Sequence, residues 1–574
     1  MASEREPLLI PPIPETSSLP SSPTSTSMSS IDRRMQNRSR DVIRYISFAS
    51  AILSCLCAGS ITAYSLYGHL FQERLRYTQL EVNYVVIAAE LAMYLLVPLF
   101  GYICDRIGPA SLSFASAIMF ATGYLLAALT YRSGASPITG LTYQRGWPIW
   151  VMILSFTIIG AATTCMYISA VTTCAKNFGR GKYAGLALAC PIASFGLSGM
   201  WQSQVASRIL YERHHDGTRG DVDVFKFFIF LAVTLLAVGL LGTVLLKVVD
   251  EEELIDEAVE ELERSGLLED SEFFRRGRGY GTIETGEHDE EEAQQAEDAK
   301  ALEEEEARKK TWLLNDETRR FLKDHTMWWL AGGFFFISGP GEAFITNLGT
   351  IIGTLYPPSA DVTRNTSAAT HVSIVALTST IARVLLGTLT DVLAPAPASH
   401  HQQYVSAANS SAPLPPQRRF TVSRVTFLLG SGVMLFLGQV LLASGLIQNH
   451  GERFWLVSSL IGSGYGALFS LTPLIISVIW GVENFGTNWG IVAMVPAVGA
   501  TVWGVIYSSV YQWAAENYPL FHRMAGEPDE VLCYGKQCYE ITFWSMAASV
   551  AFGCALWIWA WKGPHGWSAR GISV

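Results

Sequence analysis

Twelve apolar segments, separated by short polar stretches, constrain the fold of this chain more than any other feature. Each is long enough, at about 20 residues or more, to cross the ~30 Å hydrocarbon core of a bilayer as a helix. Lipid offers backbone polar groups no partner, so such segments must be helices or barrel strands. Barrel strands would alternate in hydropathy over ~10 residues, a pattern that the sequence lacks. We therefore predict an all-α membrane protein with twelve transmembrane helices in two six-helix bundles. The segments lie at about 43–66, 82–103, 110–131, 148–174, 182–206 and 224–248, and at about 327–355, 368–393, 422–447, 454–480, 487–513 and 540–562.

Charge is scarce and unevenly distributed, as expected for a chain surrounded by lipid. Charged residues make up 16% of the chain and hydrophobic residues 50%, whereas a soluble domain is about 25% charged. The net charge of −10 comes largely from one acidic segment, so it predicts no nucleic-acid partner. No basic stretch followed by an apolar one opens the chain. We therefore predict no secretory signal peptide, and we expect the first helix to direct membrane insertion.

Hydrophilic regions precede, divide and follow the two bundles. Residues 1–42, rich in Ser, Pro and charge, are predicted to form a disordered cytoplasmic tail. Residues 249–326 contain the run EHDEEEAQQAEDAKALEEEEARKK and cannot form a core of their own. We interpret them as a solvated acidic cytoplasmic connector, with a regulatory role as the alternative. The bundles then occupy 43–248 and 327–562, and 563–574 form a cytoplasmic C-terminal tail.

The distribution of Lys and Arg predicts the orientation, because these residues collect on the cytoplasmic side of a membrane protein. Basic groups precede the first helix, lie in the connector and lie between helices eight and nine, which helix parity puts on one side. A second basic group falls on the opposite side. The larger set places both termini and the connector in the cytoplasm. That set is Arg33, Arg34, Arg38, Arg40, Arg44, Arg275, Arg276, Arg278, Lys309, Lys310, Arg418, Arg419 and Arg424, and the opposing set is Arg74, Arg76, Arg208, Arg213 and Arg219.

The two halves echo each other at the predicted cytoplasmic ends of helices two and eight. Helix two ends with Gly101 and Asp105, and helix eight with Gly387 and Asp391, so each glycine stands four residues before an aspartate. Two six-helix repeats related by an axis along the membrane normal are a transporter design, with the substrate site at the midplane between them.

A longer echo involves the tripeptide Asn-Phe-Gly, which occurs at 177–179 and at 484–486. We predict that it opens helix five and helix eleven. In each half a glycine follows, and six residues after that glycine come Pro191 and Pro496. These prolines are expected to bend their helices rather than to bind a ligand.

The segment GYICDRIGP, residues 101–109, resembles the loop motif of the major facilitator superfamily between helices two and three. Residues 58–83, AGSITAYSLYGHLFQERLRYTQLEVN, resemble the nodulin-like branch of that superfamily. Residues 334–357, FFFISGPGEAFITNLGTIIGTLYP, are similar to fungal vacuolar transporters named as monocarboxylate-permease homologues (Mch-type). The resemblance covers about 43–562 and implies a twelve-helix protein that works by alternating access, without a catalytic site, metal or cofactor. The residues that match the nodulin-like pattern are Gly59, Ser60, Tyr64, Ser65, Tyr77, Gln79, Leu80 and Asn83.

Three charged residues inside predicted helices are candidates for the substrate or proton site. A charge at this depth costs at least ~2.5–3.5 kcal/mol unless it has a partner or a hydrated cavity. Arg383 could bind a substrate carboxylate through two hydrogen bonds, or it could pair with a carboxylate of its own bundle. In monocarboxylate transporters an acidic residue stands one turn before this arginine, whereas here the position holds Ser379.

Glu342 lies in the Gly-Pro-Gly-Glu segment of helix seven, residues 339–342. Glycine and proline allow a transmembrane helix to break there and free its carbonyls. A carboxyl group withdrawn from water can bind and release a proton, so Glu342 is a candidate proton carrier. The alternative is a counter-charge to Arg383. Glu90 in helix two is a weaker candidate of the same kind, which could instead face a water-filled vestibule.

The superfamily-like motif predicts a gate rather than a binding site. Asp105 and Arg106 stand at a helix end, where a carboxylate can contact a cation or the N-terminus of a neighbouring helix and hold the cytoplasmic side shut. Asp391 occupies the equivalent position in the second half. The glycines of both copies permit close helix approach, and they are Gly101, Gly108 and Gly387.

Three peripheral signals complete the analysis. Glu4, Leu8 and Leu9 fit an acidic dileucine sorting signal, E-x-x-x-L-L, which cytoplasmic adaptors read and which directs membrane proteins to a vacuole or lysosome. Cys533 and Cys538 lie close together in a polar loop on the non-cytoplasmic side, where a disulfide is plausible. The sequon at Asn365 is on the same side and is a glycosylation candidate, whereas those at Asn37 and Asn409 should be cytoplasmic and unused.

Two hypotheses follow for the function. The first is a vacuolar-membrane secondary transporter for a small organic solute, anionic and driven by protons. The second is a transporter-fold solute sensor that signals through the acidic connector, and a channel is a distant third. The sequence contains no GxxxxGK[ST] phosphate-binding loop, so ATP-driven pumping is not expected.

Overall fold

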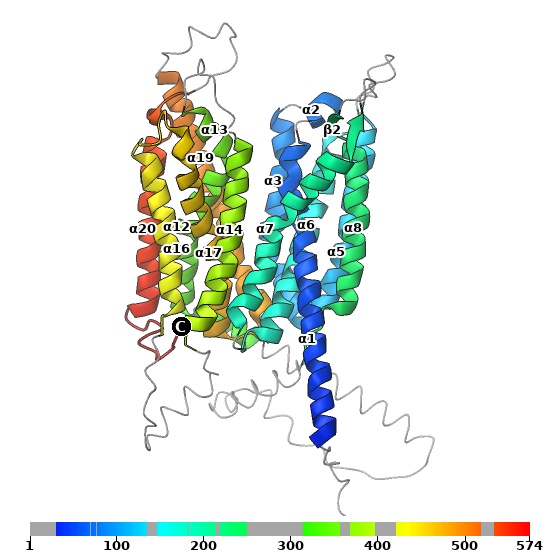
Figure 1. Ribbon diagram of the computed structural model, residues 1–574, viewed down its shortest axis with the longest axis vertical. Helices are drawn as coiled ribbons and strands as arrows, with labels where there is room; N and C mark the ends of the chain where they lie inside the picture. Colours follow the sequence, from blue (N-terminus) through cyan, green and yellow to red (C-terminus); the bar gives the residue numbers. More distant parts are fainter. Residues whose placement is uncertain are drawn as a thin grey trace, which may run out of the picture.

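The computed structural model describes residues 30–134, 146–213, 219–249, 314–355, 368–395, 421–517 and 533–574, apart from residues 69, 76, 78 and 182. Its helices form two bundles that stand side by side (Figure 1). In Figure 1 the first bundle is blue to green and the second is lime to red. The beginning of α1 and the C-terminal residue lie at the same end of the molecule, the lower end in this view.

The first bundle contains six long segments, two of which are divided. A 3-10 helix continues the first segment, and a bend divides the second at Leu96. A short helix and a two-stranded ribbon lie at the upper end. The elements are α1 (Ser30–Ala58), η1 (Ser60–Leu66), α2 (Leu70–Leu75), α3 (Gln79–Leu95), α4 (Val97–Ile107), α5 (Pro109–Arg132), α6 (Ile149–Phe178), α7 (Ala184–Ile209), β1 (Tyr211–Arg213), β2 (Arg219–Val222) and α8 (Val224–Leu245).

The second bundle repeats this plan with six segments of its own. Short helices extend the seventh segment and divide the eleventh. The elements are α12 (His325–Thr346), α13 (Leu348–Gly353), α14 (Ala368–Leu393), α16 (Arg424–Ala443), η3 (Gly451–Arg453), α17 (Phe454–Trp480), α18 (Phe485–Ala493), α19 (Val495–Asn517), η4 (Lys536–Cys538) and α20 (Glu540–Lys562).

Length and composition identify the membrane-crossing helices. Among the described residues, ten helices are long and apolar enough to cross a bilayer, and the bent pair α3–α4, at 42°, makes an eleventh. The remaining segment, α12, is less apolar because it contains several glycines and Glu342, yet it is packed into the second bundle. Gly339 lies against Gly499 of α19, and Gly333 against Gly553 of α20. Small residues that bring two backbones together are typical of helix contacts in membranes.

The Gly-Pro-Gly segment does not break α12, which differs from the expectation for helix seven. The helix continues through Pro340 to Thr346. Proline has no N–H, so it leaves the carbonyl of Phe336, four residues earlier, without its helical partner. The Ser549 hydroxyl of α20 donates to that carbonyl at 2.7 Å, and Gln439 Nε2 of α16 donates to the carbonyl of Pro340 at 3.4 Å. Neighbouring helices therefore satisfy the backbone at the proline.

Two predicted boundaries are wrong. Asn177 and Phe178 end α6 rather than open the fifth long helix, because Gly179 is the C-cap of α6 and α7 begins at Ala184. The Asn177 side chain joins α6 to the end of α8, since its Nδ2 donates to the Lys247 carbonyl at 2.9 Å. At the other boundary, α1 starts at Ser30, so the last part of the predicted disordered tail is helical.

The end of the predicted connector is also structured. Residues 314–323 form a helix that immediately precedes α12. Residues 250–313 of the connector, the sorting signal and the sequons at Asn365 and Asn409 lie outside the described residues, as does the side chain of Asn37.

Candidate functional site

The two bundles contact each other closely at the lower end in Figure 1, through glycines of both sequence motifs. A Cβ atom added to Gly101 of α4 would overlap the carbonyl oxygen of Gly486 in α18. In the same way, a Cβ on Gly185 of α7 would overlap the carbonyl oxygen of Gly387 in α14. Only glycine fits such backbone contacts, so these positions allow the halves to meet. We call this pair of contacts the gate.

Asp105 occupies one side of the gate and is fully buried. Its carboxylate accepts hydrogen bonds from the backbone N–H groups of Gly486 at 3.2 Å and Thr487 at 2.6 Å, and from the Thr487 hydroxyl at 2.9 Å. These N–H groups form the first turn of α18, which a negative charge stabilises. Lys176 of α6, itself buried, forms an ion pair with Asp105 at 3.3 Å.

Asp391 has the mirror-image role on the other side of the gate. It accepts hydrogen bonds from the backbone N–H groups of Gly185 at 2.7 Å and Leu186 at 2.8 Å. These residues form the first turn of α7. Each half therefore contributes an aspartate that caps a helix N-terminus of the other half. Both motif aspartates were predicted from the sequence, but the helices that they contact were not.

The other motif residues surround Asp105. The Arg106 guanidinium lies over the Tyr102 ring at 4.0 Å and donates to Asn315 Oδ1 at 2.6 Å. Gly108 joins α4 to α5 at φ 95°, a left-handed conformation that favours glycine. The ion pair of Lys176 and Asp105 lies within the first bundle, whereas an ion pair between Arg180, which follows α6, and Glu483, which precedes α18, crosses the gate.

Glu342 lies in α12, and residues of both bundles hold it. Its carboxylate accepts a hydrogen bond from Tyr94 of α3 at 3.2 Å and another from Tyr465 of α17. Tyr94 belongs to the first bundle and Tyr465 to the second, so this carboxylate bridges the halves. A Cβ at Gly341 would lie 2.7 Å from the Tyr465 ring. The hydrogen bond between Tyr465 and Glu342 therefore requires a glycine at position 341.

Arg383 of α14 also reaches across to the other bundle. The side chain is buried, at 8% exposure, and Nη1 donates to the backbone carbonyl of Ile192 in α7 at 3.0 Å. Its Nε has no hydrogen-bond partner among the described residues. Arg383 and Glu342 interact electrostatically, but no ion pair joins them within the described part of the chain. Arg383 therefore forms no direct ion pair with a carboxylate of its own bundle, which was one alternative for this residue. Glu342 is likewise not a counter-charge in direct contact with Arg383.

Glu90 of α3 interacts electrostatically with Glu342, although its side chain is exposed. Ser379, at the position of the missing acidic residue, is 5% exposed and packs against the backbone at Gly466 of α17.

Several residues around Glu342 and Arg383 were not predicted from the sequence. Tyr94 and Tyr465 hold Glu342. A chain of aromatic rings begins at Tyr465, whose ring centroid lies 4.9 Å from that of Phe469, and continues from Phe469 to Phe334 at 5.3 Å. Tyrosine and tryptophan are common in transmembrane helices, so no sequence signal distinguishes these from residues that face lipid. Only the packing of the two halves identifies them.

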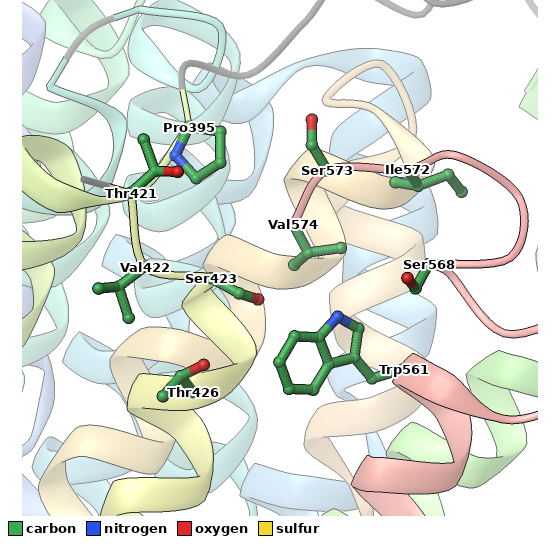
Figure 2. Close-up of a pocket in the computed structure, with 10 residues that line it drawn as sticks. All are labelled: Pro395, Thr421, Val422, Ser423, Thr426, Trp561, Ser568, Ile572, Ser573 and Val574. Carbon is green, nitrogen blue, oxygen red and sulfur yellow. The ribbon is translucent and has the colours of Figure 1, made fainter. Parts of the chain in front are cut away.

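A separate cavity of about 430 Å³ lies at the lower end of the second bundle (Figure 2). Figure 2 shows the C-terminal residues 572–574 and Trp561 of α20 around it, opposite Ser423 and Thr426 at the start of α16. Hydroxyl and apolar side chains line this cavity, without a charged one. It belongs to one bundle alone, so it does not resemble a transport site.

The structure joins Cys533 and Cys538, the two loop cysteines, in a disulfide that links the chain before η4 to the last residue of η4. The other seven cysteines are free, and five of them are buried within the helices, as apolar residues would be. The described residues contain no group of three or more His, Cys, Asp or Glu that could hold a metal ion.

Two six-segment helical bundles, a gate between them and buried charges shared by both define a membrane transporter of the two-bundle class. The model of the Major Facilitator Superfamily matches residues 47–504, and the chain belongs to this superfamily. The predicted fold class and family are therefore confirmed.

Named relatives of similar length support the same class. The chain is 57% identical over 550 residues to "Probable transporter mch1" of Neurospora crassa, covering 92% of this chain and 91% of that protein. It is 54% identical over 572 residues to the protein of the same name in Aspergillus fumigatus, covering 95% and 89%. Among solved structures, it is similar to the proton:xylose symporter XylE bound to 6-bromo-6-deoxy-D-glucose. The TM-score is 0.57 at 11% identity, over 92% of this chain and 97% of that one, which shows a shared fold alone.

Proposed function

We propose that this transporter moves a small organic carboxylate together with a proton across the vacuolar membrane by alternating access. One observation carries the proposal: Glu342 and Arg383 are charged side chains of the second bundle that both reach the first bundle, and no direct ion pair joins them in the described part of the chain. Each is hydrogen-bonded to the opposite half, Glu342 to Tyr94 and Arg383 to the Ile192 carbonyl. Movement of one half relative to the other must therefore change the surroundings of both charges.

Arg383 is the proposed contact for the substrate carboxylate. Among the described residues its Nε has no hydrogen-bond partner, and Nη1 has only a backbone carbonyl. A guanidinium has five donors in a planar arrangement that fits a carboxylate. An incoming carboxylate would supply the acceptor that this buried group lacks.

Glu342 is the proposed proton carrier, because its charge state affects substrate binding. An anionic Glu342 beside a substrate carboxylate places two like charges together, which is unfavourable in a site of low polarity. A proton on Glu342 removes that repulsion. Proton and carboxylate therefore bind together, and symport follows from their proximity. Glu90 faces Glu342 from the exposed side and is the proposed relay to solvent.

The gate supports alternating access at the motif end. Asp105 and Asp391 each cap a helix N-terminus of the other half, so both contacts must break when the halves separate at this end. With the orientation set by Lys and Arg, this is the cytoplasmic end, and the described arrangement is closed toward the cytoplasm.

Uptake into proteoliposomes tests the substrate class. Labelled organic acids are screened with and without an imposed pH gradient, using the parent protein, Arg383→Ala and the control Arg453→Ala. Arg453 is exposed at the start of α17, so its loss removes the same charge away from the site. We expect Arg383→Ala to reduce uptake at least ~30-fold, as removal of one partner of a buried charged contact costs ~2–5 kcal/mol. Equal uptake by both variants would contradict the role of Arg383.

The vacuolar location rests on the dileucine signal at Glu4, Leu8 and Leu9. A fluorescent fusion carrying Leu8→Ala and Leu9→Ala should move to another membrane. An unchanged vacuolar signal would contradict a role for this motif.

A further inference from the structure

Residues 314–323, at the end of the acidic connector, are helical and lie against the closed gate. Its C-terminal end leads directly into α12, so it is covalently part of the second bundle. Leu314 is 3% exposed and Phe321 is fully buried. A segment of a solvated linker would not bury two apolar side chains, so this helix is a packed element of the transporter.

Two contacts hold the helix to the second bundle beside the gate. The Phe321 ring packs edge-on against Trp480, at the end of α17, with centroids 5.0 Å apart. Thr318 Oγ1 accepts a hydrogen bond from Asn484 Nδ2 at 2.7 Å. Asn484 is the residue immediately before α18, and α18 is the helix whose first turn Asp105 caps. The helix at 314–323 therefore touches the moving part of the gate.

A third contact reaches the first bundle. Asn315 Oδ1 accepts a hydrogen bond from Arg106 Nη2 at 2.6 Å. Arg106 is the arginine next to Asp105 at the end of α4, so one short helix contacts both walls of the gate. Because the helix is part of the second bundle, the bond between Asn315 and Arg106 must break when the bundles separate.

Charges around Glu317 concentrate at the same place. Glu317 faces Glu483 and Asp105 as like charges, and Arg320 and Lys176 as opposite ones. One of its carboxylate oxygens is buried without a hydrogen-bond partner among the described residues. The helix thus carries an additional acidic group into a gate that already contains two carboxylates. Its packing through Phe321 and Thr318 must offset that repulsion.

We propose that the helix at 314–323 is a clasp that holds the cytoplasmic gate closed by joining Arg106 of the first bundle to Asn484 and Trp480 of the second. It gives the end of the acidic connector a direct role in conformational control. The inference depends on the proposed alternating access, because a clasp has a function only if this end opens.

A buried reporter measures gate opening in the full-length protein. Thr390 of α14 is fully buried, and its hydroxyl oxygen would lie 2.6 Å from a Cβ on Gly185 of α7. Thr390→Cys is nearly isosteric and places a thiol where the two bundles meet. We would measure its rate of alkylation in detergent by mass spectrometry, with the native buried cysteines as internal references.

Phe321→Ala is compared with Leu322→Ala in the Thr390→Cys background. Leu322 is the adjacent side chain on the same helix and is 40% exposed, so its loss removes similar apolar volume outside the contact. We expect Phe321→Ala to raise the alkylation rate at least ~10-fold, since removing a buried aromatic side chain costs well over the ~1.4 kcal/mol that equals tenfold. Leu322→Ala should leave the rate unchanged within about twofold.

Asn315→Ala keeps the test decisive if Phe321→Ala fails to fold. Asn315 is exposed, so its truncation removes the contact with Arg106 and leaves the core intact. We expect a roughly threefold increase in rate, the size of a typical net hydrogen bond. Unchanged rates for both Asn315→Ala and Phe321→Ala would overturn the clasp.

Asp105→Asn is the positive control that separates the clasp from the proposed function. Fast labelling of Asp105→Asn with parent-like labelling of Phe321→Ala and Asn315→Ala would refute the clasp and leave alternating access intact. If Asp105→Asn also leaves the Thr390→Cys thiol protected, this end does not open, and the proposed function fails together with the clasp.

Discussion

Replacing Asp105 by asparagine should open the gate more than any other single substitution at this end. The carboxylate is fully buried and accepts three hydrogen bonds from Gly486 and Thr487. It also pairs with the buried Lys176 at 3.3 Å. Asparagine has nearly the same shape and keeps one acceptor oxygen, but it loses the charge on which both the helix N-terminus and Lys176 depend.

The size of the effect follows from these contacts. Hydrogen bonds to a charged group contribute ~1.5–3 kcal/mol and neutral ones ~0.5–1.5 kcal/mol, and removing one member of a buried ion pair costs ~3–5 kcal/mol. Asparagine keeps part of the hydrogen bonding, so we expect the closed arrangement to lose about 3 kcal/mol. This loss lowers the ratio of closed to open protein by a factor of ~100.

Alkylation of Thr390→Cys measures this ratio, provided that opening and closing are faster than labelling. Asp223→Asn is the matched control, because Asp223 caps the N-terminus of α8 and pairs with Lys226 at 2.8 Å, at the opposite end of the first bundle. We expect ~100-fold faster labelling for Asp105→Asn and a parent-like rate for Asp223→Asn. An increase of less than about threefold for Asp105→Asn, under ~1 kcal/mol, would refute the assignment of Asp105 to the gate.

Three further predictions concern the gate and the loop. Gly101→Ala should increase labelling of Thr390→Cys, because its Cβ overlaps the Gly486 carbonyl, whereas Gly430→Ala, with open space around it, should not; equal rates would contradict the close contact. Burial, followed by repulsion from Glu483 and Asp105, raises the pKa of Glu317 well above its usual value, so the clasped form binds a proton more tightly than the released form. The clasp is therefore most stable at low pH and weakens as pH rises through that raised value, and parent protein should label faster than Glu317→Gln in alkaline buffer but equally in acid. A ratio of the two rates that does not change with pH would contradict this linkage. Cys533 and Cys538 should react with a maleimide reagent only after reduction; equal labelling with and without reductant would exclude the disulfide in the mature protein.

The sequence predicted the helices well because each transmembrane segment carries its own signal. Most apolar segments have the length and hydropathy that lipid demands, with α12 as the exception among the described residues, and the exact ends of the helices depended on tertiary context. The repeated Asn-Phe-Gly shows this limit. Asn177 ends α6 and contacts Lys247, whereas Asn484 precedes α18 and contacts Thr318. The same tripeptide therefore has two structural roles, which local sequence does not distinguish.

The candidate site could be predicted only in part, for the same physical reason. Glu342 and Arg383 were identifiable because a charge in an apolar helix is costly, and Asp105 was identifiable because it stands in the loop motif. Their partners were not, because Tyr94, Lys176 and the N-terminus of α18 come from other helices, and in each case the contact depends on how the helices meet. The helix at 314–323 was missed because half of its residues are charged, as in the hydrophilic segment before it, although it buries Phe321.

Coupled accumulation by Glu342→Gln tests the central claim most directly. Glutamine imitates a protonated glutamate that cannot release its proton, so the variant should bind the carboxylate and exchange it across the membrane. It should not accumulate the carboxylate against a gradient when a pH difference is imposed. We would measure both counterflow exchange and pH-driven accumulation in proteoliposomes, with Glu452→Gln, an exposed residue of η3, as the control. Parent-like exchange with lost accumulation is the predicted result, and retained pH-driven accumulation by Glu342→Gln would contradict the account.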